Sequence, residues 1–216
     1  MTFRLALLLL AMLVDALTSP AEILDRVAVT VGKQVITESD VIRDLRVSAF
    51  LDQKPLDLSG EQKRKAADRL VDQILILQET ESSRLELSSA ADAAHLLDQV
   101  KSQYATEADY RAALARYRIT EQELLDHLSA GLRTMRFTDL RFRPEVEFTE
   151  EDLRDFYQTL AVDWRRANPA HVPSFEESRG QVEKLLTEQT VMQALDRWLG
   201  AVRTETQILY RDAVFK

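Results

Sequence analysis

Apolar residues recur with a period of two in the first segment that follows the N-terminal leader, residues 25–36. Three valines occupy every second position between residues 27 and 31, which is typical of a strand with one buried face. Gly32 and Lys33 come next, and a glycine at the first central position suits a type II′ turn because it adopts a positive φ without steric cost. The pattern predicts a β-hairpin that returns through residues 34–36.

The apolar period changes to that of an α-helix directly after the hairpin. Thr37 is placed to cap this helix through the amide of Asp40, and both Glu38 and Asp40 put negative charge at its N-terminus. Apolar residues at i, i+4 and i+8 then predict a short helix over residues 40–52, and Pro55 follows as a stop.

Helical periods dominate the rest of the chain. Capping boxes at Thr120 with Glu123 and at Thr149 with Asp152 mark two helix starts. Further helices are predicted after Ser59, from a cap at Ser88 or Ser89 to Lys101, over residues 106–117 and 120–142, from 149 to 160, and from Phe175 through an apolar stripe that includes Val182, Leu185, Leu186, Met192, Leu195, Leu199 and Val202.

The chain ends in a predicted strand, Thr206 to Tyr210. A lone hairpin is marginally stable, so we expect this strand to complete the N-terminal hairpin and bring the two chain ends together. Residues 161–174 contain two of the five prolines and are predicted to be a linker. The predicted fold class is therefore mostly α, with a small N-terminal β-hairpin that a C-terminal strand completes.

The first residues predict export. Arg4 precedes an uninterrupted apolar run from Leu5 to Val14, which is too short to span a bilayer and is typical of a secretory signal. We expect a signal peptide over residues 1–21 with cleavage after Ala21, or alternatively near Ala16. A bacterial periplasm is the preferred compartment.

Composition excludes several classes of function. The chain has no cysteine, which excludes disulfides, zinc-thiolate sites and thiol nucleophiles, and its formal net charge of −8 makes it a poor nucleic-acid binder. Its five glycines form neither a dinucleotide fingerprint nor a Walker loop. The pairs Asp92 with His95 and Glu123 with His127 favour ordinary surface pairing over a metal site, and His171 is expected to be solvated. No catalytic residue, metal or cofactor is predicted.

The order of elements resembles that of the N-terminal module of SurA-type periplasmic chaperones, a peptide-binding module of the SurA and trigger-factor type. The pieces DRVAVTV and VITESDV carry the resemblance, together with the L-x-L-S turn at Leu85 to Ser88 and the helices that follow. It implies a helical chaperone region over residues 22–160, completed by the helix and strand of residues 175–216. SurA-like proteins insert parvulin prolyl isomerase domains where this chain has 14 residues, too few for a domain, so no isomerase activity is expected.

A region rich in arginine and aromatic residues, from Tyr104 to Trp164, is the candidate binding surface, because such side chains offer adaptable apolar, stacking and cation–π contacts. The stretch from Met135 to Phe142 holds four large apolar residues that cannot share one narrow stripe, so some are expected at the surface. The predicted client-binding residues are Tyr104, Tyr110, Tyr117, Met135, Phe137, Leu140, Phe142 and Trp164; for each aromatic residue, core packing is the alternative.

The resulting hypothesis is a non-catalytic, ATP-independent chaperone for unfolded exported proteins, such as outer-membrane protein precursors, with neither nucleic-acid binding nor stable membrane insertion. A binding or assembly subunit for one dedicated periplasmic partner is the alternative. The proline-containing linker joins two parts that must pack together, so either a monomer or a domain-swapped dimer is expected.

Overall fold

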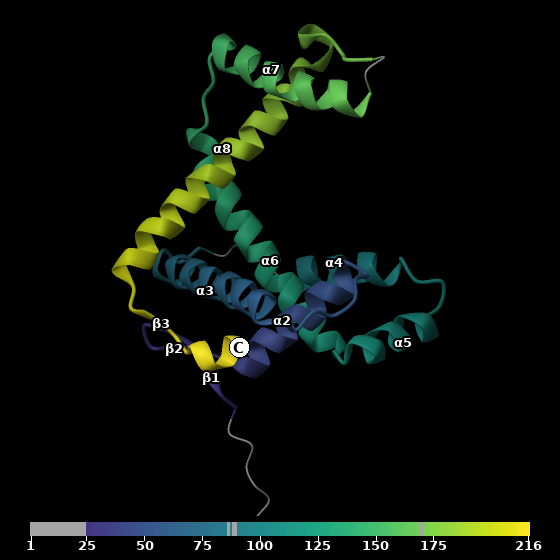
Figure 1. Ribbon diagram of the computed structural model, residues 1–216, viewed down its shortest axis with the longest axis vertical. Helices are drawn as coiled ribbons and strands as arrows, with labels where there is room; N and C mark the ends of the chain where they lie inside the picture. Colours follow the sequence, from purple (N-terminus) through teal and green to yellow (C-terminus); the bar gives the residue numbers. More distant parts are fainter. Residues whose placement is uncertain (1–24, 86, 88–89, 169–170) are drawn as a thin grey trace, which may run out of the picture.

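A computed structural model describes residues 25–85, 87, 90–168 and 171–216 of the chain (Figure 1). Within these residues the fold is mostly helical, with one small sheet, as the sequence predicts. The predicted signal peptide, its cleavage site, and parts of the L-x-L-S turn lie outside the described residues. In chain order the elements are β1 (Val27–Val31), β2 (Gln34–Thr37), α2 (Glu38–Leu51), α3 (Gly60–Ser82), α4 (Ala90–Lys101), α5 (Glu107–Tyr117), α6 (Glu121–Phe142), the 3-10 turn η2 (Arg143–Glu145), α7 (Glu150–Ala167), α8 (Phe175–Glu205), β3 (Ile208–Tyr210) and the 3-10 turn η3 (Asp212–Phe215).

The sheet joins the two ends of the described chain. Its order is β2-β1-β3, and both neighbours of β1 run antiparallel to it. Val31 faces Gln34 across a two-residue loop in which Gly32 has a φ of +56°, so the hairpin and its use of glycine are confirmed. The predicted pairing of the terminal strand is confirmed as well, because Val31 faces Ile208 on its other side.

Capping boxes mark the starts of four helices. The hydroxyls of Thr37, Thr120, Thr149 and Ser174 each accept a hydrogen bond from the backbone amide three residues later, and the carboxylate there accepts one from the cap amide in return. Two orphan amides at each helix start are thereby satisfied. Ser59 precedes α3 without such a side-chain bond.

The predicted linker is shorter than the sequence indicates. Helix α7 continues to Ala167, so the prediction of a linker over residues 161–174 is wrong for its first seven residues. Ala161 is buried, and the ring of Trp164 packs edge-on against that of Tyr157 with centroids 6.2 Å apart. These apolar contacts prolong the helix although the polar sequence around them lacks a clear period.

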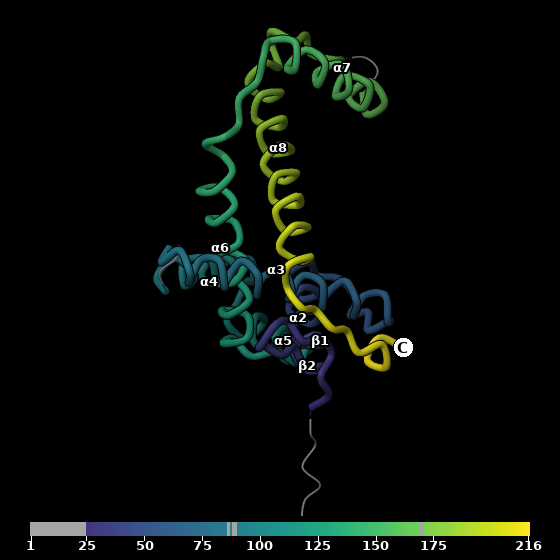
Figure 2. The backbone as a smooth tube through the Cα atoms, turned by 90° about the vertical axis from the view of Figure 1, so that its left-hand side faces the viewer, coloured from purple at the N-terminus to yellow at the C-terminus, as the bar shows by residue number. Residues whose placement is uncertain are grey.

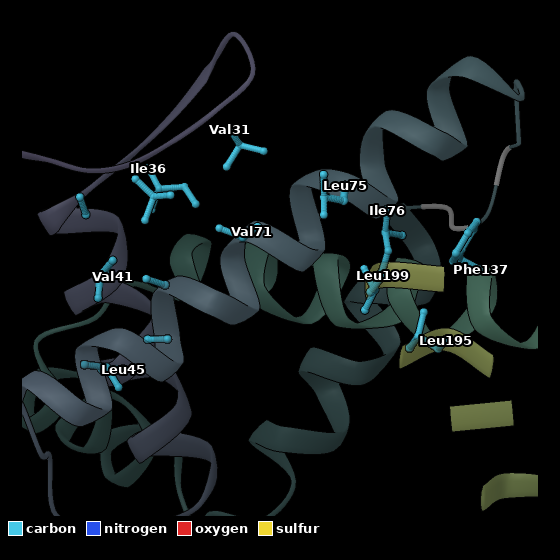
Figure 3. Close-up of a cluster of buried hydrophobic side chains, with 14 of the residues drawn as sticks. Val31, Ile36, Val41, Leu45, Val71, Leu75, Ile76, Phe137, Leu195 and Leu199 are labelled. Atoms are coloured by element: carbon cyan, nitrogen blue, oxygen red, sulfur yellow. The ribbon is translucent and has the colours of Figure 1, made fainter. Parts of the chain in front are cut away.

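The main core lies where the sheet, α2, α3 and the ends of α6 and α8 meet (Figure 3). Val31 and Ile36 of the sheet face Val71 and other residues of α3. On the far side of α3, α6 contributes Phe137, and α8 contributes Leu195 and Leu199. Because α8 leads directly into β3, the C-terminal residues are structural parts of the N-terminal module rather than an appendage.

Helix α7 and the N-terminal half of α8 form an arm that extends away from the sheet (Figure 2). The arm has a small apolar cluster of its own, with buried Leu153, Phe175 and Val182. The Tyr157 hydroxyl donates a hydrogen bond to the Pro173 carbonyl (2.9 Å), which fixes the segment before α8 against α7. A single uninterrupted helix, α8, connects this cluster to the main core.

Candidate functional site

The three predicted tyrosines gather around Phe50 in a separate core between α2, α4, α5 and the start of α6. The ring of Phe50 lies 6.0 Å from that of Tyr104 and 5.8 Å from that of Tyr117. Tyr110 is buried at 1% exposure, and burial raises the pKa of its phenol. The prediction that Tyr110 lies on a binding surface is therefore wrong, because α5 needs its large side chains to close this core.

The stretch from Met135 to Phe142 is split between core and surface. Phe137 and Phe142 are buried around Trp198, whose ring centroid lies 5.0 Å from that of Phe137. The prediction that these two phenylalanines are exposed client contacts is wrong, because the main core and α8 cover that side of α6. Met135 and Leu140 are each 54% exposed, which confirms that part of the stretch reaches the surface.

Trp164 lies in the arm, far from the other predicted residues. It is half-buried and packs against Tyr157 in the α7 and α8 cluster. The eight predicted residues therefore do not form one surface: three belong to the Phe50 core, two to the main core, one to the arm, and two stand exposed on α6.

Met135 borders a hollow of about 310 Å³ between α6 and α8, which we call the α6–α8 hollow. Met192 on α8 lines the same hollow and is 52% exposed. Met192 belongs to the predicted apolar stripe of this helix, yet its side chain is exposed, whereas Val191 and Leu195 are buried. The lining residues are Gly131, Thr134, Met135, Thr138, Asp139, Arg143, Glu188, Val191, Met192 and Leu195.

The chemistry of the α6–α8 hollow is that of an adaptable apolar contact surface. Two unbranched thioether side chains stand opposite each other on neighbouring helices, and such side chains adjust to apolar partners of different shapes. The charged groups that line it have partners nearby, since Arg143 binds Asp139 at 2.7 Å and Lys184 lies 3.9 Å from Glu188. This hollow can hold apolar side chains.

A larger hollow, of about 460 Å³, lies between β2, α2, α3 and α6; we call it the β2 hollow. The residue pattern alone gives no sign of this hollow, because its walls come from four elements that only the fold brings together. Its lining residues are Val35, Ile36, Asp40, Arg43, Asp44, Val47, Leu70, Gln73, Ile74, Leu77, Glu123, Asp126, His127, Ala130 and Arg133.

Ion pairs organise one side of the β2 hollow. Asp44 is buried on α2 and accepts a 2.5 Å hydrogen bond from Arg69, while Nδ1 of His127 lies 3.4 Å from its other oxygen. Arg43 bridges Asp40 at 2.9 Å and Glu123 at 3.2 Å. These contacts tie α2 to α3 and α6 and hold the hollow open between them.

Helix-capping hydrogen bonds keep one carboxylate of this group ionised. The backbone amide of Thr120 donates to Glu123 at 2.7 Å and, with Arg43 nearby, holds the pKa of that carboxyl below its usual range. Glu123 therefore caps α6 and binds Arg43, and the expected surface pair of Glu123 with His127 is not formed.

The histidines show no arrangement for metal binding in the part of the chain that the structure describes. No group of three or more potential ligands among those residues is close enough to hold an ion. His95 lies 3.1 Å from the side-chain amide of Gln99, and Asp92 accepts a hydrogen bond from Arg136 at 2.8 Å. Each of these contacts has an ordinary structural explanation.

Comparisons with known proteins do not assign the chain. Among the described residues, no helix has both the length and the apolar character needed to cross a membrane. No protein-family model matches the chain, and no curated protein matches it. The α6–α8 hollow and the β2 hollow are therefore the candidate binding sites of the described chain.

Proposed function

We propose that this chain is an ATP-independent chaperone of the periplasm, a SurA-like protein without isomerase domains, which binds unfolded exported proteins such as outer-membrane protein precursors. The observation that carries the proposal is the α6–α8 hollow. Met135 on α6 and Met192 on α8 both line this hollow, and more than half of the surface of each side chain is exposed. Exposed apolar side chains beside a hollow are typical of an interaction site.

The position of the hollow suits a client that must later leave. Its lining includes Val191 and Leu195 of the main core and residues of both α6 and α8, so a bound segment contacts two helices at once. Contacts made by a few apolar side chains are individually weak, and release from them requires no nucleotide. The capped hairpin and its closure by β3 also agree with the element order from which the resemblance to SurA was argued.

The proposal is tested by the aggregation of a denatured outer-membrane protein diluted out of urea. We expect the chain without residues 1–21 to slow aggregation at stoichiometric ratios. The double variant Met135→Gln, Met192→Gln should need roughly tenfold more protein for the same effect, since each buried methionine contributes on the order of 1 kcal/mol or more. Failure of the unsubstituted chain to slow aggregation would overturn the proposal.

A matched control distinguishes binding in the α6–α8 hollow from non-specific binding by other exposed apolar residues. Leu56 and Leu58 are exposed at 38% and 42% in the loop between α2 and α3, and they line neither hollow. The double variant Leu56→Gln, Leu58→Gln should suppress aggregation as well as the unsubstituted chain does. A pull-down that returns one dominant folded partner, with no unfolded clients, would favour the dedicated assembly subunit instead.

A further inference from the structure

The β2 hollow adjoins the free edge of the sheet. Strand β2 is the outer strand in the order β2-β1-β3, so one of its edges has no partner among the described residues. Val35 and Ile36 are consecutive and point to opposite faces, with exposures of 50% and 3%, yet both line the hollow. A space that touches both faces of a strand lies beside its edge.

The wall that α3 forms, across the hollow from β2, is as long as a short extended peptide segment. Leu70, Ile74 and Leu77 line it from α3 at i, i+4 and i+7, a row that rises about 10 Å along the helix. An extended chain advances about 3.3 Å per residue, so three or four residues cover this row. Side chains of such a segment would meet the apolar wall at every second position.

The charges around the hollow predict which charged residue a bound segment should have near one end. Four carboxylates and two arginines line it, which makes it acidic overall. Asp40, Asp44 and Glu123 are each bound to an arginine, but in the described part of the chain no lysine or arginine lies within ion-pair distance of Asp126. Asp126 is exposed and accepts only a hydrogen bond from Gln122, at 2.8 Å, so its charge is available to a ligand.

We infer that the β2 hollow binds an extended client segment by adding it to the edge of β2, with apolar side chains at alternate positions against α3 and a lysine or arginine beside Asp126. This inference rests on the proposed function and specifies the class of segment that is bound. Backbone hydrogen bonds to β2 would supply affinity that is independent of sequence, and the apolar wall and Asp126 would supply the preference.

The test is fluorescence anisotropy with a labelled eight-residue peptide that has valine or leucine at every second position and lysine near one end. We expect a version with glutamate in place of the lysine to bind about threefold or more weakly, because a single exposed ion pair contributes on the order of 0.2–1 kcal/mol and the exchange adds repulsion. Only every second backbone amide of an added strand points towards β2. Of two peptides N-methylated at one or the other set of alternate amides, one should therefore bind more than tenfold more weakly, because it has lost its donors to the strand edge.

Two charge variants sharpen the result. Asp126→Lys should reverse the preference between the lysine and glutamate peptides, whereas Asp155→Lys, at an exposed position on α7, should leave it unchanged. Hydrogen exchange at residues 34–37 should slow when the lysine peptide is added. Equal binding of all peptides by all variants would overturn the inference.

The inference and the proposed function fail separately. A chain that slows aggregation but shows no preference among the peptides, and no protection of β2, retains the function and loses the inference. The Met135→Gln, Met192→Gln variant should still bind the lysine peptide, because neither methionine lines the β2 hollow.

Discussion

The main core and the arm differ in how they are held together. Eighteen buried apolar residues form the main core, most of them from the sheet, α2, α3, α6 and α8, whereas the cluster in the arm buries Leu153, Phe175 and Val182, and Ala161 is also buried on α7. The arm relies on half-buried aromatic residues and on exposed ion pairs such as Arg179 with Glu150 at 2.6 Å. Because buried apolar residues are concentrated where the two ends of the described chain meet, we expect most of the stability of the fold to reside there and the arm to open more readily.

The largest expected effect compares one aromatic residue from each region. Phe137→Ala removes a fully buried ring from the main core and should cost about 3–5 kcal/mol of unfolding free energy. Phe175→Ala opens a smaller, partly exposed cluster in the arm and should cost about half as much. Urea denaturation followed by circular dichroism measures both, and equal losses would mean that the arm is as firmly packed as the main core.

A medium effect concerns the closure of the sheet. The Tyr210 hydroxyl donates a 2.5 Å hydrogen bond to Asp68, and the guanidinium of Arg64 lies 3.6 Å from the centre of the tyrosine ring. Tyr210→Phe keeps the ring and removes the hydrogen bond to a charged acceptor, so we expect a loss of about 1.5–2 kcal/mol. Denaturant melts of the two proteins at pH 7 measure this loss.

The same tyrosine predicts a pH dependence. Burial and the bond to Asp68 raise the pKa of Tyr210 to about 12, above the ordinary tyrosine value. A raised pKa stabilises the fold while the phenol is protonated in both states, and this contribution is lost as pH rises from about 10 towards 12. The difference in stability between the unsubstituted chain and Tyr210→Phe should shrink over that range; a constant difference would contradict the assignment. Tyr104 and Tyr110 are present in both proteins, so their own titration cancels in the comparison.

The smallest expected effect compares two helix caps of the same kind. Thr37→Ala, at the start of α2, and Thr149→Ala, at the start of α7, each remove a capping box and should cost about 1 kcal/mol. Native-state hydrogen exchange should distinguish them, because loss of the Thr37 cap lowers protection throughout the main core, whereas loss of the Thr149 cap lowers it in the arm alone. Uniform loss of protection from both variants would show that the two regions unfold as one unit.

Local chemistry explains which parts of the fold could be predicted. The hairpin turn depends on Gly32, and every capping box depends on residues three positions apart, so neighbouring residues suffice to identify the boxes at Thr37, Thr120 and Thr149. Pairing of the terminal strand also followed, because a two-stranded hairpin needs a third strand. The end of α7 could not be predicted from the sequence, because packing of Trp164 on Tyr157 extends that helix through a segment of weak periodicity.

The binding surface was less predictable than the fold. Aromatic content directed attention to Tyr110, Phe137 and Phe142, which are buried, while Met192 and Val35 were missed and stand exposed beside the two hollows. Composition states which side chains could make contacts, but exposure depends on what packs over each helix. Asp126 and Arg133, for example, lie seven residues apart on α6, and nothing in their positions in the sequence indicates that β2 lies nearby.

The sequence by itself determined the helical class, the hairpin, the helix starts and the strand that closes the sheet, because periodicity, turn residues and caps act between neighbouring residues. Only the tertiary structure decided which apolar residues remain outside and where hollows form. Those properties arise where α8 packs beside α6 and where β2 is left at the edge of the sheet, and they depend on contacts between segments that lie far apart in the chain.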